Sequence, residues 1–353
     1  MSTQTPFGRV SPPNKAWLAK LPPEEILEPG LPIIDSHHHL WAQLPAALPQ
    51  GPGGQSNAYL LDEFAQDFNS GHNVIGTVYV QCHANYRTSG PEEMKPVGET
   101  EFAAQIGATS DLGKYGKTRV CQGIVGEANL TLGDRVEAVL QAHVQAGQGR
   151  FCGVRASAAY DPDPIIGNTS DAPGLYMRAD FRAGVARLAA MGLSLDAWVF
   201  HTQLAELIDL ARAFPQANIV VGHCGGPLGY GPYAGKRDEV FAQLKRSLTE
   251  LATCPNVSMK LGGMMIRLAA VDFLKLPAPP SSTELARLWG PYIETCIELF
   301  GPQRCMFESN FPVEKAGVSW NTLWNAFKRV TAGASAQEKA MLYSGTAQRV
   351  YKL

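Results

Sequence analysis

The chain has 353 residues, of which 45% are hydrophobic and 18% are charged, so it can bury a sizeable core as one large domain or two ordinary ones. Its 30 basic and 32 acidic side chains give a formal net charge of −2 at pH 7. This balance provides no electrostatic footprint for nucleic acid or an anionic membrane, so neither is expected as a partner.

Residues 1–32 are predicted to form an irregular N-terminal arm. They are rich in proline and polar groups, as in "SPPNK", "LPPEE" and "EPGLP". Their start, "MSTQTPFGRVSPPNK", lacks the apolar core of a signal peptide. No long low-complexity linker follows, so we expect residues 33–353 to form a single domain.

Beyond the arm, short apolar or β-branched segments alternate with helical stretches. Each segment is bounded by glycine, proline or polar residues, a pattern that predicts a β-strand. The eight predicted strands are residues 32–37, 73–81, 119–126, 151–155, 193–200, 218–223, 256–262 and 304–309.

Most intervals between these strands carry apolar residues at positions i, i+3, i+4 and i+7, the spacing of an amphipathic helix. The clearest predicted helices are residues 130–146, 181–192, 202–215, 284–301, 321–330 and 336–353. Strands that alternate with helices pair in parallel, and eight of them favour a closed (β/α)₈ TIM barrel over an open doubly wound sheet. An open sheet would usually have a glycine-rich phosphate turn after its first strand, where this chain has three histidines.

The seven cysteines are odd in number and scattered, with no CxxC pair, which indicates reduced thiols rather than a disulfide framework. The sequence also contains no run of about 18 apolar residues, so no membrane span is expected. Together these features favour a cytoplasmic protein.

Histidines gather where such a barrel carries its chemistry, at the C-terminal ends of the strands. Six of the eight fall there: His37, His38, His39, His83, His201 and His223. In extended backbone His37 and His39 both point into the barrel mouth, while His38 turns away to a local hydrogen bond. Neutral imidazoles suit a divalent metal, and His201 and His223 could complete the ligand set. The alternative is that each strand-end histidine is an ordinary hydrogen-bonded loop residue.

Other polar residues follow the same strand ends. They are Gln81, Arg155, Lys260, Glu308 and Asn310. Gln81 and His83 come directly after the second strand and are candidates for contact with a substrate. Lys260 is a further candidate, or else it pairs with a carboxylate inside the barrel.

These residues lie in a series of motifs that resembles a known family. The motifs are "IIDSHHHLW", "FCGVR", "LSLDAWVFHTQLAELIDLARAFPQANIVVGHCGGP", "NVSMKLGG" and "RCMFESNFPVEK". Their order is similar to that in the amidohydrolase-2 group of the amidohydrolase superfamily. Within it, the chain looks most like the branch that contains sugar lactonases and 2-pyrone-4,6-dicarboxylate lactonase. The resemblance spans roughly residues 30–353.

The resemblance implies a (β/α)₈ barrel that hydrolyses an ester, lactone or amide. It matches His37 and His39 to the family's strand-1 pair, His223 to the strand-6 histidine and His201, approximately, to the strand-5 position. One divalent metal, with zinc as the expected ion, is therefore implied. Some relatives are lactonases that work without a tightly held metal, so a metal-free mechanism stays open.

Arg155 stands in the strand-4 region where many members of the superfamily place a bridging lysine or glutamate. An arginine cannot bridge two metals, which argues against a binuclear centre. In the lactonases, arginines near this region resemble anchors for a substrate carboxylate. Arg155 and Arg87 are therefore expected to bind substrate through paired hydrogen bonds.

The chain departs from the family at the eighth strand. Relatives usually read "SDWP", with an aspartate that binds the metal and acts as the general base, whereas this chain reads "ESNFP" and has Asn310 there. An amide cannot take a proton from water at neutral pH, but Asn310 could still orient a water or donate to a carbonyl. Glu308 would share a strand face with Asn310 in extended backbone, so Glu308, His83 and His201 are the candidate replacements.

The expected function is a hydrolase that opens a small carboxylated lactone or ester by water attack on a polarised carbonyl. The alternative is a metal-dependent decarboxylase of an aromatic or related acid. A lesser alternative is a degenerate, non-catalytic barrel that binds a ligand. A small molecule is the expected partner, and self-association stays open.

Overall fold

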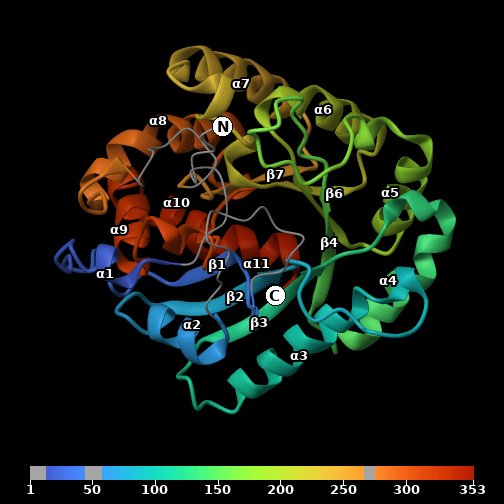
Figure 1. Ribbon diagram of the computed structural model, residues 1–353, viewed down its shortest axis with the longest axis horizontal. Coiled ribbons are helices and arrows are strands. Elements are labelled where there is room, and N and C mark those ends of the chain that lie inside the picture. The colour runs from blue at the N-terminus through green and yellow to red at the C-terminus, as the bar shows by residue number, and fades with distance from the viewer. Residues whose placement is uncertain (1–12, 44–57, 266–274) are drawn as a thin grey trace.

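A computed structural model of the protein describes residues 13–43, 58–265 and 275–353. Its eight strands form one parallel sheet in which neighbours follow chain order from β1 to β8 (Figure 1). The strands are β1 (Ile33–His38), β2 (Val74–Val80), β3 (Arg119–Gly126), β4 (Phe151–Ser157), β5 (Ser194–Trp198), β6 (Asn218–Val221), β7 (Val257–Leu261) and β8 (Cys305–Phe307). The predicted strands and the (β/α)₈ barrel are thus confirmed, with strand ends that shift by up to two residues.

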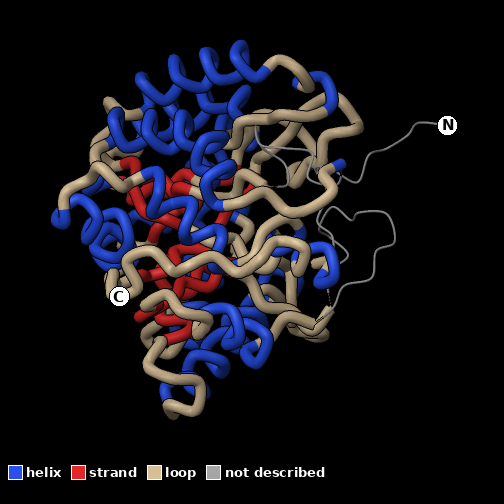
Figure 2. Tube along the Cα trace, turned by 90° about the vertical axis from the view of Figure 1, so that its left-hand side faces the viewer, coloured by secondary structure: helices blue, strands red, loops and turns tan. Residues whose placement is uncertain are grey.

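Helices surround this sheet, and Figure 2 shows the strands in the middle of the molecule with helices outside them. The helices are α1 (Lys15–Leu18), α2 (Leu61–Phe68), α3 (Val97–Asp111), α4 (Val136–Ala146), α5 (Ala179–Ala190), α6 (Leu204–Ala213), α7 (Arg237–Leu251), α8 (Ser282–Phe300), α9 (Trp320–Val330), α10 (Ala336–Ala340) and α11 (Thr346–Tyr351). The predicted helix at 130–146 begins as a 3₁₀ turn because Gly133 has a φ of 58°. None of the described helices is long and apolar enough to cross a membrane.

The barrel closes between β1 and β8 mainly through groups just beyond the short strand β8. Ser309 donates to both carboxylate oxygens of Asp35, from its backbone N–H at 2.7 Å and its hydroxyl at 2.6 Å. The N–H of Asn310 donates to the carbonyl of His37 at 2.8 Å. Burial raises the pKa of Asp35 to about 7. This closure places the end of β1 beside the end of β8.

The C-terminal helix α11 fills part of the barrel interior. Val350 and Tyr351 pack in one cluster with Val78, Val220 and other apolar strand residues. The Tyr351 hydroxyl donates to the Asp196 carboxylate at 2.6 Å. The last residues of the chain therefore support polar groups inside the barrel.

Residues 25–28 of the N-terminal arm lie against helix α9. Asn325 and Lys328, both buried on α9, donate to carbonyl oxygens of Glu25, Leu27 and Glu28. The arm therefore replaces water as the partner of these buried polar side chains. Where the single barrel domain begins within the chain stays a prediction.

His143 on α4 connects two helices and a strand end below the barrel mouth. Its Nε2 donates to the carbonyl of Glu127 at 2.8 Å, and its Nδ1 accepts from the Thr100 hydroxyl at 2.8 Å. Its ring stacks on Phe151 with centroids 4.9 Å apart. Burial lowers the pKa of His143 to about 4, so the folded protein holds it neutral.

We expect stability to fall as the pH drops from about 6.5 to 4, because unfolded His143 takes up a proton that the folded protein refuses. His143 contributes up to about 3 kcal/mol to this loss. Denaturant unfolding with a chelator present should therefore give a smaller pH slope for His143→Gln than for the wild type. Gln145→His, which adds an exposed imidazole on the same helix, is the control that should leave the slope unchanged. Equal slopes for His143→Gln and the wild type would contradict the assignment.

Candidate active site

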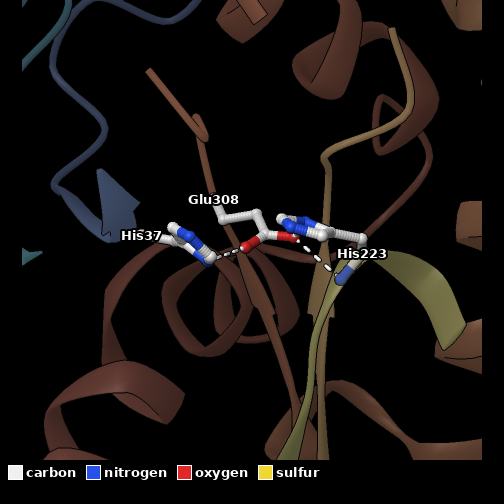
Figure 3. Close-up of side chains that lie close together, drawn as sticks. All are labelled: His37, His223 and Glu308. Atoms are coloured by element: carbon white, nitrogen blue, oxygen red, sulfur yellow. Dashed lines mark hydrogen bonds and ion pairs between the residues drawn. The ribbon is translucent and has the colours of Figure 1, made fainter. Parts of the chain in front are cut away.

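The barrel mouth is organised around the carboxylate of Glu308, which follows β8 and is fully buried. One of its oxygens accepts from the backbone N–H of His223 at 3.0 Å and contacts the Nδ1 of that residue at 2.7 Å. Its other oxygen lies 2.8 Å from the Nδ1 of His37 (Figure 3). One carboxylate thus joins the ends of β1, β6 and β8.

Two glycines after β7 make room for this arrangement. A Cβ at Gly262 would lie 2.4 Å from the carbonyl oxygen of Glu308. A Cβ at Gly263, which has a φ of +64°, would lie 2.0 Å from the Nδ1 of His223. The "KLGG" segment therefore keeps side-chain atoms out of the space that Glu308 and His223 occupy. The sequence-based prediction assigned these glycines no role, although they stand in the same motif as Lys260.

His39 completes the cluster, and the alternation predicted along β1 is present. The Nε2 atoms of His37 and His39 lie 3.2 Å apart, and the Nδ1 of His39 donates to the carbonyl of Val80 at 2.7 Å. His38 instead contacts the Thr77 hydroxyl at 2.8 Å and stacks on Phe64. Because the Nδ1 of His39 is protonated and donates to Val80, the Nε2 of His39 carries a lone pair, and this lone pair faces His37.

Burial and charge define the protonation of the cluster. Burial opposes ionisation of Glu308, but the contacts with His223 and His37 outweigh it and hold the pKa of the carboxyl well below its usual range. Burial, together with the positive charges of Lys260 and Arg155, lowers the pKa of His37 and His39 respectively. The anionic carboxylate of Glu308 therefore lies beside the neutral imidazoles of His37 and His39.

These groups fit a divalent cation. Ligand atoms of His37, His223 and Glu308 lie within 4.8 Å of one another. The 3.2 Å between the Nε2 atoms of His37 and His39 is close to the separation of two nitrogens at about 2.05 Å from a tetrahedral zinc, about 3.3 Å. Two facing lone pairs at that distance repel unless a proton or cation lies between them. The carboxylate behind the imidazoles also matches the outer contacts of metal-binding histidines.

Asn310 does not share the face of Glu308, so that expectation is wrong. Its φ is 52°, in the left-handed region that asparagine tolerates, and the strand geometry ends before it. Its Nδ2 donates to the Glu314 carboxylate at 3.4 Å, and another oxygen of that carboxylate accepts from the N–H of Met265 at 2.7 Å. Among the described residues, Asn310 makes no side-chain contact with the histidine cluster.

Arg155 reaches a cavity that the cluster also lines. The cavity is bordered by His37, Arg155, Asp196, Ala197, Trp198, Gly222, His223 and Lys260. The Nη2 of Arg155 donates to the carbonyl of Gln81, whereas its Nε and the Gln81 side-chain oxygen are buried without a partner. In the described part of the chain no carboxylate pairs with this guanidinium. Lys260, by contrast, donates from its Nζ to the Asp196 carboxylate at 2.8 Å. This agrees with the prediction that Lys260 pairs with a carboxylate inside the barrel.

The loop after β2 carries a second polar cluster. The Nδ1 of His83 lies 3.0 Å from a Glu127 carboxylate oxygen and 3.2 Å from the Tyr86 hydroxyl, which itself donates to Glu127. The side chains of His83 and Glu127 are both 30% exposed. Arg87 pairs with Glu101 on α3 instead, so the structure gives it no contact with either histidine cluster.

His201 lies apart from the other mouth histidines. Its ring packs edge-on against Tyr233 with centroids 5.1 Å apart, and its Nδ1 accepts from the N–H of Leu228 at 3.4 Å. Its Nε2 is buried without a partner. The structure therefore does not bring His201 into contact with His37, His223 or Glu308, although the sequence predicts it as a ligand.

A (β/α)₈ barrel with a buried histidine–carboxylate centre at the C-terminal ends of its strands defines a class of barrel hydrolases. The model of the amidohydrolase family matches residues 34–353, so the chain belongs to that family and is a hydrolase. The resemblance drawn from the motifs is thereby confirmed.

Two curated proteins and one solved structure are similar to this chain. It is 30% identical over 176 residues to an L-fucono-1,5-lactonase of Burkholderia multivorans, which covers 50% of this chain and 56% of that protein. It is 25% identical over 298 residues to an L-rhamnono-gamma-lactonase of Scheffersomyces stipitis, which covers 80% and 85% respectively. A solved amidohydrolase of B. multivorans with bound zinc has the same fold, with a TM-score of 0.68, 24% identity, and coverage of 91% of this chain and 99% of that one.

Gly263→Ala should displace His223, since the new methyl group would occupy the position of its ring. We expect at least a tenfold loss of affinity for Zn²⁺, measured by calorimetry. The left-handed backbone of the new alanine should also lower the free energy of unfolding by roughly 1 kcal/mol. Gly174→Ala is the matched control, because Gly174 also has a positive φ, of 81°, but meets no atom within 4 Å. Equal Zn²⁺ affinity in the two variants would show that Gly263 does not shape the site.

Proposed function

We propose that this protein is a lactonase that opens a small carboxylated lactone or ester by attack of water on its carbonyl. The observation that carries the proposal is Arg155, a half-buried guanidinium without a carboxylate partner, in the wall of the cavity that His37 and His223 line. A buried cation of this kind calls for an anion from outside the chain. The two sugar lactonases among the relatives support a lactone as the group that is opened.

Arg155 would hold the substrate carboxylate. Its bond to the carbonyl of Gln81 fixes the plane of the guanidinium, and its Nε remains free to donate. The unpaired side-chain oxygen of Gln81 would accept from a substrate hydroxyl beside it. Lys260, held by Asp196, adds positive potential from the interior of the barrel. These groups would place the lactone carbonyl against the histidine cluster.

A single zinc ion would be held by His37, His39 and His223, with the carboxylate of Glu308 behind two of these imidazoles. When bound, it would supply a Lewis acid for the carbonyl or the attacking water. Glu308 would provide the negative charge that the three imidazoles lack, and so would compensate for Asn310 at the position of the family's aspartate. His201 would be left to contact substrate through its unpartnered Nε2 rather than the ion.

We also propose a cytoplasmic location and a small-molecule substrate as the principal partner. All seven cysteines are free, which suits a reducing compartment. Self-association stays a prediction, as does the absence of nucleic-acid and membrane partners.

Arg155→Gln should lower kcat/KM about a hundredfold for a carboxylated lactone, because it removes the paired hydrogen bonds to a charged group. The same variant should act on an uncharged lactone of the same ring size within threefold of the wild type. Hydrolysis is followed in a pH-stat over a panel of sugar and dicarboxylate lactones. If no lactone or ester in the panel is opened, with or without added Zn²⁺, the proposed function is wrong. Release of CO₂ from an aromatic acid would favour the decarboxylase instead.

Metal analysis of the purified protein should find about one divalent ion per chain. Glu308→Gln should weaken Zn²⁺ binding about 10- to 100-fold, because it removes the negative charge and frees the Nδ1 atoms of His37 and His223. Glu127→Gln, which removes the carboxylate of the second cluster, should bind Zn²⁺ as the wild type does. If Glu308→Gln retains wild-type affinity, the carboxylate does not support the ion.

A further inference from the structure

The proposed lactone opening needs a group that takes a proton from water, and the described centre of the mouth does not offer one. Glu308 has no exposed surface, and its two oxygens already contact His37 and His223. Asn310 is an amide that faces Glu314. A proton acceptor that exchanges with solvent must therefore come from another part of the mouth.

The pair of His83 and Glu127 has the required form. The carboxylate lies 3.0 Å from the Nδ1 of His83, which places the ring proton there and leaves the Nε2 as a lone pair. Among the described residues no group bonds that Nε2, and both side chains are 30% exposed. Tyr86 also donates to the carboxylate and so limits its rotation.

The surrounding backbone holds this pair in place. His83 has a φ of 65°, a left-handed conformation that a histidine rarely adopts without support. The same loop packs against the start of α3 so tightly that a Cβ at Gly98 would lie 2.6 Å from the carbonyl of Asn85. On the other side, His143 bonds the carbonyl of Glu127 itself. Strain fixed by such contacts is typical of functional positions.

Arg155 connects this pair to the histidine cluster. Its Nη2 donates to the carbonyl of Gln81, two residues before His83. Its positive charge lowers the pKa of His39 on one strand and contributes to lowering that of Glu127 on another. A carboxylate bound by Arg155 would therefore lie within reach of both clusters.

We propose that His83, oriented by Glu127, is the general base and then the general acid of the lactone opening, an assignment that rests on the proposed function. The Nε2 of His83 takes a proton from water as the water oxygen bonds to the carbonyl carbon. The ring C–O bond then breaks, and the imidazolium returns that proton to the leaving oxygen. The products are a hydroxyl group and a carboxylic acid, which loses its own proton to solvent.

Three charged or titratable groups interact with His83, and the charge of Arg155 acts on one of them, Glu127. Tyr86 lies on the same loop as His83, Glu127 follows β3, and Glu99 comes from α3. Burial raises the pKa of Tyr86 far above its usual value, and burial also raises the pKa of Glu99. Tyr86 therefore keeps its proton through neutral pH, whereas the raised pKa of Glu99 moves its titration toward that range.

The kinetic test uses His83→Asn, because asparagine tolerates the positive φ of this position but has no basic nitrogen. We expect kcat on the best lactone to fall at least a hundredfold with KM within threefold, and the acid limb of the kcat/KM profile to disappear. Glu127→Gln should move the acid limb to lower pH, since the imidazolium loses its negative neighbour. Glu101→Gln, which removes a carboxylate bonded to the same loop, is the control and should leave kcat and profile unchanged.

A second measurement needs no substrate. Nitrogen-15 NMR of histidine-labelled full-length protein should show His83 protonated at Nδ1 above its titration, and Glu127→Gln should move the neutral ring toward the Nε2-protonated form. If the wild type opens no lactone, the proposed function fails and these spectra alone decide on the pair. An Nε2-protonated His83 in the wild type, or a His83→Asn variant with unchanged kcat, overturns the assignment.

Discussion

The site depends on one interaction, the buried carboxylate of Glu308 held between the Nδ1 atoms of His37 and His223. A buried anion without partners would be strongly destabilising, and here two imidazoles and a backbone N–H compensate it. The same contacts determine which nitrogen of each histidine faces the cavity. Because His37 lies near the end of β1 and the other two residues follow β6 and β8, the carboxylate also connects strands that are distant in sequence.

This interaction requires an unusual backbone around it. His223, Cys224 and Asn310 all have positive φ values, and Gly262 and Gly263 exclude side-chain atoms that would collide with the pair. Left-handed backbone at residues other than glycine is destabilising and persists only where the surroundings enforce it. Left-handed residues gather at the ends of β6 and β8. This indicates that the fold tolerates a loss of stability there, which keeps the carboxylate and the imidazoles together.

The sequence was sufficient for the barrel and for the grouping of mouth histidines, because strand periodicity and the order of strands do not depend on local detail. It was not sufficient for the partners of those histidines. The role of Glu308 depends on the left-handed turn at Asn310, which no spacing rule predicts. Glu127 lies beside His83 in a loop whose backbone is left-handed at His83 and Asn85, which the sequence pattern does not predict. The salt bridge of Arg87 to α3 likewise depends on how one loop folds back.

The two carboxylates of the mouth differ in the property that decides what each can do. Glu308 has no exposed surface and shares its charge with two imidazoles, so it can hold charge in the centre but cannot exchange protons with water. Glu127 is 30% exposed and supports an imidazole whose far nitrogen is free. Active sites commonly separate the tasks of two titratable groups through their environments. With Asn310 unable to act as a base, such a separation would place charge stabilisation at Glu308 and proton transfer at the solvent-accessible pair.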